Sequence, residues 1–382
     1  MPSPNPFVYG EVVPKSAFVG RRAELDRLIA DLANGQKIFL ISPRRYGKSS
    51  LIRQAFAGLE RQRIATLEIT VSSFSSYVAF LEGYVRALAS LDANAAEARS
   101  WLHGLFTTFT PEWRTDTSDR RAWAVSFPSV RTARDASRLA AEVFALPARI
   151  AARLGRRLVI AMDEFQAVAG YDAGNVEHTL RAAVQQQRQV GYVFAGSEPS
   201  LMEQMIGARR PFYKAGPVLR LGRIPADVFA EFIDDRFKKS GLAPEAGLGS
   251  AIVDVAGNLP YDVQRLAHET WDDVSADRRR RVSLDDVHAT LHRLLAEQDV
   301  FFEAVWQRLT LAQRAVLRAV VLEHGEAILG GDVRVRYRLG GASSVQTALA
   351  ALQRLDLVAR DDAGHYAVVD SLMREWVARR TY

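Results

Sequence analysis

Three consecutive residues near the start of the chain, Gly47-Lys48-Ser49, have the types that a phosphate-binding loop requires. They follow an apolar run at residues 38–41 and precede a helical pattern that begins at about Lys48. Such a helix points its free N–H groups at phosphates, and glycine lets the backbone approach them closely. Lys48 would contact the β- and γ-phosphates, and the Ser49 hydroxyl would bind Mg²⁺. The motif therefore predicts a site for a nucleoside triphosphate and Mg²⁺.

The loop departs from the usual pattern G-x-x-x-x-G-K-[ST] at one position, because Ser42 replaces the first glycine. A small residue can end a strand without a positive φ angle, so we interpret Ser42 as compatible with the loop. The residues that we expect to bind the nucleotide here are Pro43, Arg44, Arg45, Tyr46, Gly47, Lys48, Ser49 and Ser50.

A second motif places two carboxylates at the end of another apolar run, residues 158–162. A run of this kind is typical of a buried parallel strand. Asp163 would hold Mg²⁺, and Glu164 would polarise the water that attacks the γ-phosphate. The alternative is an ordinary acidic turn between a strand and a helix. The upstream loop favours the catalytic pair.

A third apolar run, residues 192–195, ends in Gly196-Ser197-Glu198. Two roles are open for Ser197. Its hydroxyl would contact the γ-phosphate or orient the water, or it would cap the helix that begins at Pro199, and the two roles are compatible with each other.

These motifs, with others, resemble the archaeal-type AAA+ ATPases, which are also called DEXX-box ATPases and are close to the STAND group. The resemblance spans essentially the whole chain. The segments that carry it are Asn5-Pro6-Phe7, Phe18-Val19-Gly20-Arg21-Arg22-Ala23-Glu24-Leu25, Pro43-Arg44-Arg45-Tyr46-Gly47-Lys48-Ser49-Ser50-Leu51, Asp163-Glu164-Phe165-Gln166, Gly196-Ser197, Pro211-Phe212-Tyr213 and Gly257-Asn258-Leu259-Pro260.

The resemblance implies an ATPase that uses ATP and Mg²⁺, and it implies further site residues. Phe18, Val19, Gly20 and Arg21 would border the adenine. Either Arg209 or Arg210 would be a phosphate-sensing arginine. Gly257 and Pro260 would form the lid contact near the nucleotide, in place of the sensor arginine of typical AAA+ lids. This replacement favours a STAND-like switch.

The order of the predicted elements indicates an α/β fold. Strands alternate with helices in the first half, which is typical of a P-loop NTPase (AAA+-like) parallel sheet sandwiched by helices. From residue 225 the pattern is wholly helical. We predict a P-loop ATPase core at residues 1–224, a helical lid at 225–282, a linker helix at 283–309 and a winged-helix domain at 310–382. Residues 92–122 have no clean periodicity, and we leave their structure open.

The winged-helix prediction rests on helical patterns at residues 312–323 and 344–355, followed by a hairpin at 357–369. Residues 332–339 are ambiguous, because apolar and charged residues alternate there as they would in a strand. The family resemblance favours a short helix for this segment.

A winged helix binds DNA, docks a protein partner or acts as an intramolecular clamp. On the candidate recognition helix, Gln346 and Gln353 offer amides that read base edges, and four nearby cations would contact phosphates. These cations are Arg334, Arg336, Arg338 and Arg360. Against DNA binding, Asp361-Asp362 at the wing tip would repel a phosphate backbone.

Composition is compatible with these predictions and excludes some classes. The chain of 382 residues has a net charge of +6, which is modest for its length, and no cysteine, so disulfides and thiolate metal sites are excluded. No apolar run approaches the roughly 18 residues that span a membrane. We expect a soluble, cytoplasmic protein without a membrane partner. Residues 278–281, four arginines, form either a plain exposed turn or a nucleic-acid contact.

Two functional hypotheses follow. The first is an ATP-hydrolysing AAA+-like machine that acts with duplex DNA through its winged helix. The alternative is a STAND-like nucleotide switch or scaffold that retains ATP or ADP and whose winged helix docks a protein partner. A homo-oligomer fits either hypothesis.

Overall fold

The computed structural model describes residues 4–92, 94–115, 123–171, 176–360 and 364–380. Contacts between residues divide the chain into two compact units. The first, here called the sheet unit, comprises residues 22–43 and 48–221. The second, the helical unit, comprises residues 1–21, 44–47 and 222–382. The three boundaries between our four predicted domains, at residues 224, 282 and 309, stay a prediction.

The sheet unit is built on five parallel strands. Their spatial order is β2 (Ala65–Thr70), β5 (Leu158–Asp163), β6 (Val190–Gly196), β1 (Lys37–Ile41) and β7 (Val218–Arg220). Every residue of β5 and β6 is buried, which is why both read as continuous apolar runs. Ile41 pairs with Gly196, and Met162 pairs with Phe194. The ends of β1, β5 and β6 therefore lie at the same edge.

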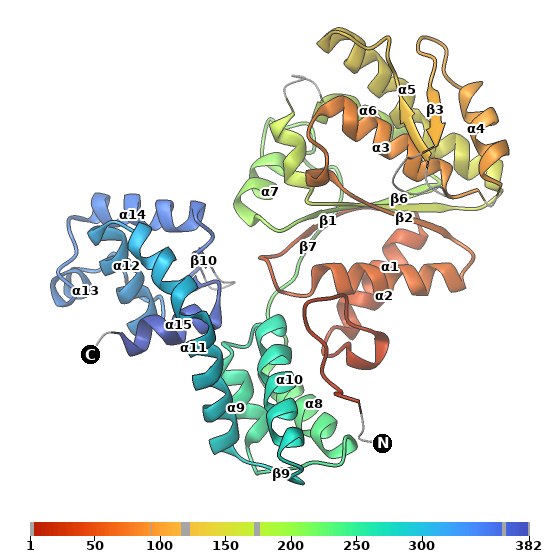
Figure 1. Cartoon of the computed structure of the whole chain (residues 1–382). Coiled ribbons are helices and arrows are strands. Elements are labelled where there is room, and N and C mark those ends of the chain that lie inside the picture. Colours follow the sequence, from red (N-terminus) through yellow and green to blue (C-terminus); the bar gives the residue numbers. More distant parts are fainter. Residues whose placement is uncertain (1–3, 93, 116–122, 172–175, 361–363, 381–382) are drawn as a thin grey trace. The chain divides into compact units, whose positions relative to one another are not determined.

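Helices cover both faces of this sheet (Figure 1). One face carries α1 (Arg22–Ala33) and α2 (Lys48–Arg61), and the other carries α3 (Tyr77–Ala89), α5 (Ala133–Leu154) and α6 (Val176–Gln186). Short elements connect them: η2 (Val71–Ser73), η3 (Phe165–Gly170) and α7 (Pro199–Ile206). Stacked aromatic rings, such as Phe39 with Phe194 at 5.1 Å, fill the core. The predicted α/β sandwich is confirmed.

The segment that we left open, residues 92–122, contains α4 (Ala95–His103) and β3 (Glu112–Thr115), and β3 pairs antiparallel with β4 (Trp123–Ser126), which follows the segment. Trp113 packs against the core, and the guanidinium of Arg99 lies 3.3 Å from the centre of the Trp123 ring. The pairing of β3 with β4 depends on the register between two short strands. No helical or strand periodicity in the sequence indicates that register.

The helical unit begins with η1 (Lys15–Ala17) and continues as α8 (Ala226–Lys239), β8 (Ala243–Pro244), α9 (Leu248–Val255), α10 (Pro260–Ala276), β9 (Arg281–Val282) and α11 (Leu284–Arg308). The N-terminal segment packs on these helices. Phe7 is buried with its ring 4.7 Å from that of Phe237, and the Tyr9 hydroxyl donates to Glu269 at 2.6 Å. The predicted run of packed helices after residue 225 is confirmed.

The C-terminal part is a winged helix. Its elements are α12 (Leu311–Leu322), α13 (Gly331–Arg336), α14 (Ala342–Arg354), the antiparallel strands β10 (Val358–Arg360) and β11 (Tyr366–Val368), and α15 (Ser371–Arg379). Residues 331–336 are helical, so the strand alternative for residues 332–339 is wrong. Asp361 and Asp362 lie outside the described residues.

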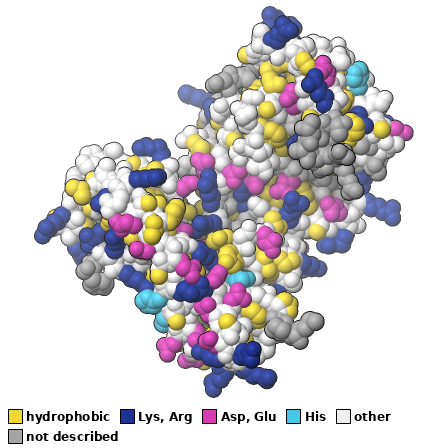
Figure 2. All heavy atoms as spheres, viewed as in Figure 1, with side chains coloured by type: hydrophobic (Ala, Val, Ile, Leu, Met, Phe, Trp, Pro, Cys, Tyr) yellow, Lys and Arg dark blue, Asp and Glu magenta, His cyan; other side chains and the backbone are white. Residues whose placement is uncertain are grey.

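Charged side chains of both signs are distributed over the molecular surface. Figure 2 shows lysines and arginines interspersed with aspartates and glutamates across the visible face. Within the described ranges, the structure contains no helix with the length and apolar character of a membrane span.

Candidate nucleotide-binding site

In the sheet unit, Lys48 and Asp163 meet at the carboxyl edge of the strands. Lys48 is the first residue of α2, and Asp163 is the last residue of β5. The buried Lys48 Nζ forms an ion pair with Asp163 Oδ1 and lies 3.6 Å from Glu164 Oε1. The Ser49 hydroxyl lies 3.5 Å from Asp163 Oδ2. These three residues, which we predicted from two separate motifs, are therefore in direct contact.

Glu164 lies beside this cluster with its backbone in the left-handed region, at φ 52° and ψ 43°. Its Oε2 accepts hydrogen bonds from the Ser197 hydroxyl at 2.6 Å and from the Gln166 amide at 2.5 Å. Glu198, and not Ser197, stands at the N-cap of α7. The capping alternative for Ser197 is therefore wrong, and its hydroxyl contacts the predicted catalytic carboxylate.

The residues present fit a Mg²⁺ ion that shares its coordination with phosphate. Among the described residues, no group of three or more histidines or carboxylates could hold a metal by itself. Mg²⁺ characteristically takes one or two protein oxygens and completes its shell with phosphate and water. Ser49 and Asp163 supply a hydroxyl and a carboxylate at this edge. The Asp163 carboxylate also contacts one cation in the structure, the ammonium of Lys48.

A further carboxylate near this edge was not predicted. Glu68 lies on β2 and forms an ion pair with Arg53 of α2 at 2.8 Å. Burial raises the pKa of Glu68, Arg53 lowers it, the negative Asp163 raises it and Lys48 lowers it. In the sequence Glu68 reads only as a polar residue in an alternating strand, so no signal marks it.

In the helical unit, two arginines of the loop contact carboxylates. Arg44 Nη1 lies 3.2 Å from Asp356, which follows α14. Arg45 Nη1 lies 2.7 Å from Asp370, the N-cap of α15, and 3.5 Å from Asp262 of α10. Both arginines were predicted to bind the nucleotide, and here each is paired with an acidic side chain.

Backbone conformation at this loop is unusual at two positions. Gly47 has φ +86°, which glycine adopts without strain, and Arg45 has φ +69°. A left-handed conformation costs a residue with a side chain roughly 1–2 kcal/mol. The ion pairs of Arg45, and the Tyr261 ring 4.9 Å from its guanidinium, oppose that cost.

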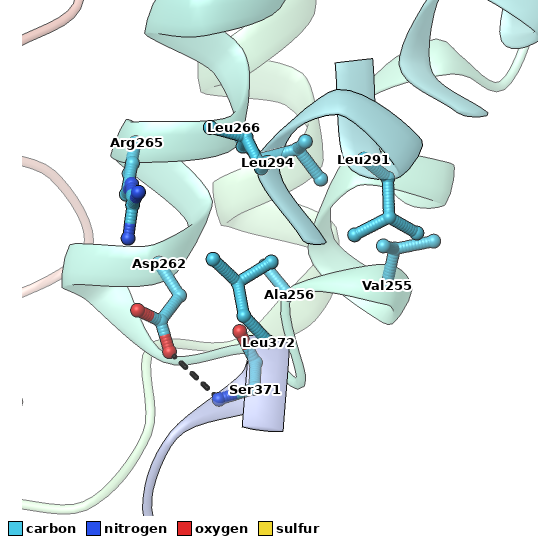
Figure 3. A pocket seen from close by; sticks show the side chains of 9 residues that line it. All are labelled: Val255, Ala256, Asp262, Arg265, Leu266, Leu291, Leu294, Ser371 and Leu372. Carbon is cyan, nitrogen blue, oxygen red and sulfur yellow. Dashed lines mark hydrogen bonds between the residues drawn. The ribbon is translucent and has the colours of Figure 1, made fainter. Parts of the chain in front are cut away.

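Asp262 is the most deeply buried of these carboxylates, with 4% of the residue exposed. Burial raises its pKa to about 6, and the negative Asp370 adds to this rise, while Arg45 and the hydrogen bonds from Ser371 oppose it. Figure 3 shows its carboxylate at a pocket whose other walls include Leu266, Leu294 and Leu372. The Ser371 N–H donates to it at 3.2 Å. Apolar side chains around the Asp262 carboxylate disfavour its charged form, because they solvate a charge less well than water does.

The residues predicted to border the adenine also lie in the helical unit. Phe18 and Val19 are half-buried, whereas Arg21 is only 4% exposed. Arg21 donates to the carbonyl oxygens of Tyr46 at 3.2 Å and Gly222 at 2.5 Å. A Cβ on Gly20 would lie 2.4 Å from Ile224. Arg21 therefore supports the loop backbone, and the contact with adenine stays a prediction.

Gly257 and Pro260 flank the turn between α9 and α10. Gly257 has φ +61°, and a Cβ there would lie 2.9 Å from Arg374 Nη1. Arg374 also donates to the Val255 carbonyl at 2.8 Å. Its role in this turn was not predicted, because Arg374 lies more than a hundred residues away in the sequence.

The two candidate sensor arginines follow α7. Arg210 pairs with Glu177 of α6 at 2.9 Å, and Arg209 is exposed with φ +70°. Neither role is tested by this geometry, so both stay predictions.

The comparisons with known proteins address the fold. Residues 300–379 match the family model described as a probable winged helix domain. No curated protein matches the sequence of the chain. The structure is similar to a Walker-type ATPase of Pyrococcus abyssi, with a TM-score of 0.62 and 16% identity over 96% of this chain and 99% of that one.

Two ORC proteins of Aeropyrum pernix are also similar. The ORC2 protein, solved as ADPNP–ADP complexes, has a TM-score of 0.58 and 12% identity over 99% of this chain and 98% of that one. The ORC1 protein, solved in complex with DNA, has a TM-score of 0.51 and 13% identity over 96% and 95%. This chain has the fold of a P-loop ATPase with a winged helix. The expected AAA+-like fold, with its C-terminal winged helix, is thereby confirmed.

Proposed function

We propose that this chain is an AAA+-like ATPase that binds ATP with Mg²⁺ and hydrolyses it, acting with DNA through its winged helix. The observation that carries the proposal is the contact of Lys48 with Asp163, beside a Glu164 that is hydrogen-bonded to Ser197. Three motifs far apart in the sequence contribute these side chains to one edge of a parallel sheet, where α/β proteins bind phosphates.

Each side chain has a distinct part in the proposed reaction. Lys48 would exchange its contact with Asp163 for the β- and γ-phosphates, while Ser49 and Asp163 hold Mg²⁺. Bound Mg²⁺ would neutralise charge on the phosphate oxygens. Glu164 would orient the attacking water through a carboxylate oxygen, and Ser197 would hold the other oxygen. Catalysis of phosphoryl transfer depends mainly on positioning of this kind.

An assay of ATP hydrolysis, with and without duplex DNA, tests the proposal directly. We expect steady turnover by the wild-type chain, stimulation by DNA and loss of turnover in Glu164→Gln. Glu231→Gln, an exposed change on α8, is the matched control and should keep full activity. Wild-type turnover that survives unchanged in Glu164→Gln would reject the assigned site.

The DNA part of the proposal rests on the surface of the winged helix. Gln346, Thr347 and Arg354 are exposed on α14, while Gln353 is half-buried. Of the predicted phosphate contacts, Arg336 is paired with Glu323 at 2.6 Å, and Arg360 donates to the Tyr366 hydroxyl at 2.9 Å. The ORC1 structure with DNA is a precedent for this fold on DNA.

One observation favours the second candidate function, a STAND-like nucleotide switch. Arg44 and Arg45, which we predicted to bind the nucleotide, are held by Asp356 and Asp370 of the winged helix. Nucleotide phosphates would compete with these carboxylates for the same guanidinium groups. Binding of nucleotide would then release the winged helix for a protein partner.

The double variant Asp356→Asn/Asp370→Asn tests this second function. Asparagine still caps a helix, so α15 keeps its N-cap while the charge is lost. A switch predicts tighter ADP binding by the variant than by the wild type, because the competing carboxylates are gone. Equal ADP affinity, together with steady wild-type hydrolysis, would reject the switch and leave the ATPase. Asp235→Asn/Asp285→Asn removes two exposed charges elsewhere and serves as the control.

A further inference from the structure

Gln166 lies beside Glu164, the proposed catalytic carboxylate. It follows Glu164 by two residues, in η3, and only 7% of it is exposed. Its Nε2 donates to Glu164 Oε2 at 2.5 Å and lies within hydrogen-bond distance, 3.3 Å, of Glu198 Oε1. One amide nitrogen therefore contacts two carboxylates that follow two neighbouring strands, β5 and β6.

The two hydrogen bonds to Glu164 fall on the same oxygen. Gln166 and Ser197 both donate to Oε2, whereas Oε1 lies 3.6 Å from Lys48 Nζ, on the side of the phosphate-binding residues. A carboxylate anchored through one oxygen presents the other in a defined direction. Two donors fix that direction better than one, because each restricts rotation of the carboxylate.

We propose that Gln166 is a positioning residue for hydrolysis. With Ser197, it anchors Oε2 of Glu164 so that Oε1 faces the attacking water. The proposal rests on the ATPase function proposed above and adds to it a residue that no motif role covers. Gln166 does not touch the nucleotide in this assignment and acts only through Glu164.

The residues around the side-chain amide of Gln166 leave room for it in this orientation. Gln166 Oε1 is buried and has no hydrogen-bond partner among the described residues. A buried acceptor without a hydrogen bond is unfavourable, so the fold retains this amide in spite of one unsatisfied end. A Cβ on Gly196 would lie 2.8 Å from that Oε1 and 2.3 Å from Met202 Cγ. The glycine at the end of β6 thus provides the room that Gln166 occupies.

A second carboxylate, that of Glu198, also lies near the Gln166 amide. This carboxylate offers Nε2 a second acceptor, at 3.3 Å, on the N-cap of α7. The charged groups around Glu164 are Lys48 of α2, Asp163 of β5 and Glu198 of α7. Gln166 is thus a neutral donor that contacts two of these carboxylates, those of Glu164 and Glu198.

Steady-state kinetics of Gln166→Met tests the proposal, because methionine keeps the volume of the side chain and removes the donor. We expect kcat to fall at least about tenfold, since a small misplacement of a catalytic group lowers the rate strongly. The KM for Mg-ATP and the affinity for a non-hydrolysable ATP analogue should stay within about twofold of wild type. Gln186→Ala, an exposed change on α6, is the control and should leave both constants unchanged.

A double variant separates positioning from a general structural role. If Gln166 acts through Glu164, Glu164→Gln/Gln166→Met should lose no more turnover than Glu164→Gln alone. Urea unfolding of the single and double variants gives a second readout that is independent of hydrolysis, and the two side chains should show non-additive stability.

The outcomes distinguish the two proposals. A Gln166→Met protein with wild-type kcat would overturn the role of Gln166 and leave the ATPase intact. Additive effects in both turnover and stability would also overturn it. A wild-type chain without any turnover would instead reject the ATPase function, and the positioning role would fall with it.

Discussion

At the scale of single residues, the ammonium of Lys48 determines the charge balance of the proposed site. It is buried against Asp163, with Glu164 nearby, so one positive charge opposes two negative ones. A nucleotide brings further negative charge, which Lys48 and Mg²⁺ must neutralise together. Removal of Lys48 therefore weakens phosphate binding more than loss of one exposed lysine would.

Lys48→Ala should abolish most of the stabilisation that Mg-ATP gives. Ligand at about a hundred times its dissociation constant stabilises a fold by about 2.7 kcal/mol. Melting curves with and without Mg-ATP measure this gain in wild type, in Lys48→Ala and in the control Lys238→Ala, an exposed change on α8. An equal gain in wild type and Lys48→Ala would remove this loop from consideration.

The adjacent carboxylates should separate into metal and water roles. Asp163→Asn should raise the Mg²⁺ concentration needed for half-maximal turnover, because a neutral amide binds a hard cation less tightly. Glu164→Gln should keep nucleotide binding while turnover falls by at least about a hundredfold. Mg²⁺ titrations of hydrolysis and of fluorescent-nucleotide binding measure both effects. An unchanged Mg²⁺ midpoint in Asp163→Asn would contradict the metal assignment.

At the scale of elements, the first turn of α10 buries a charge that most helices leave in water. The Asp262 carboxylate is walled by leucines and faces Asp370, with Arg45 as its counter-ion. Its pKa is about 6 in the fold, above an unfolded value near 4. A carboxyl with a raised pKa stabilises the fold below its unfolded pKa. This contribution is lost as the pH rises through about 6.

Asp262→Asn should therefore gain stability relative to wild type as the pH rises from 4 to 7.5. The shift from 3.8 to about 6 corresponds to at most about 3 kcal/mol, because each pKa unit is about 1.4 kcal/mol. Melting temperatures of both proteins across this pH range measure the difference. Asp277→Asn, at the exposed end of the same helix, should show no such trend. A constant difference at all pH values would show that Asp262 is not the titrating group.

At the scale of the whole molecule, DNA binding would depend on a local cluster of cations. The net charge of +6 is small for 382 residues, and charges of both signs are mixed on the face in Figure 2. General attraction to a polyanion is therefore weak. Any binding should come from arginines that the winged helix brings together, and their number should appear in the salt dependence.

Replacing the four winged-helix arginines with glutamine should lower DNA affinity across sequences and flatten its salt dependence. The replaced residues are Arg334, Arg336, Arg338 and Arg360. Each true phosphate contact adds a slope of about 0.9 in log affinity against log salt. Titration of labelled duplex at several salt concentrations measures the slope. Glu323→Gln should increase it, because this change frees Arg336 from its ion pair.

The matched control replaces all four arginines of residues 278–281 with glutamine. It changes the net charge of the chain by the same amount as the winged-helix variant does. We expect this control to keep the wild-type slope, since an exposed turn is our interpretation of that segment. Equal losses in both variants would mean that only total charge matters. No binding by the wild type at low salt would reject the DNA role and favour the switch.

The sequence by itself determined what local patterns encode. The strands β1, β5 and β6 were predictable because both faces of a parallel sheet are buried, which leaves continuous apolar runs. The helices of the lid and of the winged helix were predictable because each buries one face, which gives apolar residues a helical spacing. Lys48 was predictable because it begins a helix after a strand and a glycine-containing loop, and Asp163 because it ends an apolar strand.

Only the tertiary structure decided which distant side chains meet. Arg45 and Asp370 are separated by 325 positions, yet their side chains lie 2.7 Å apart. From the sequence, Ser197 could either cap a helix or act on the γ-phosphate or water, and its contact with Glu164 arises only because β5 and β6 are neighbours. Gln166 acquired a second acceptor only because β5 and β6 are neighbours. Such contacts depend on the packing of whole elements, and no short pattern of residues contains that information.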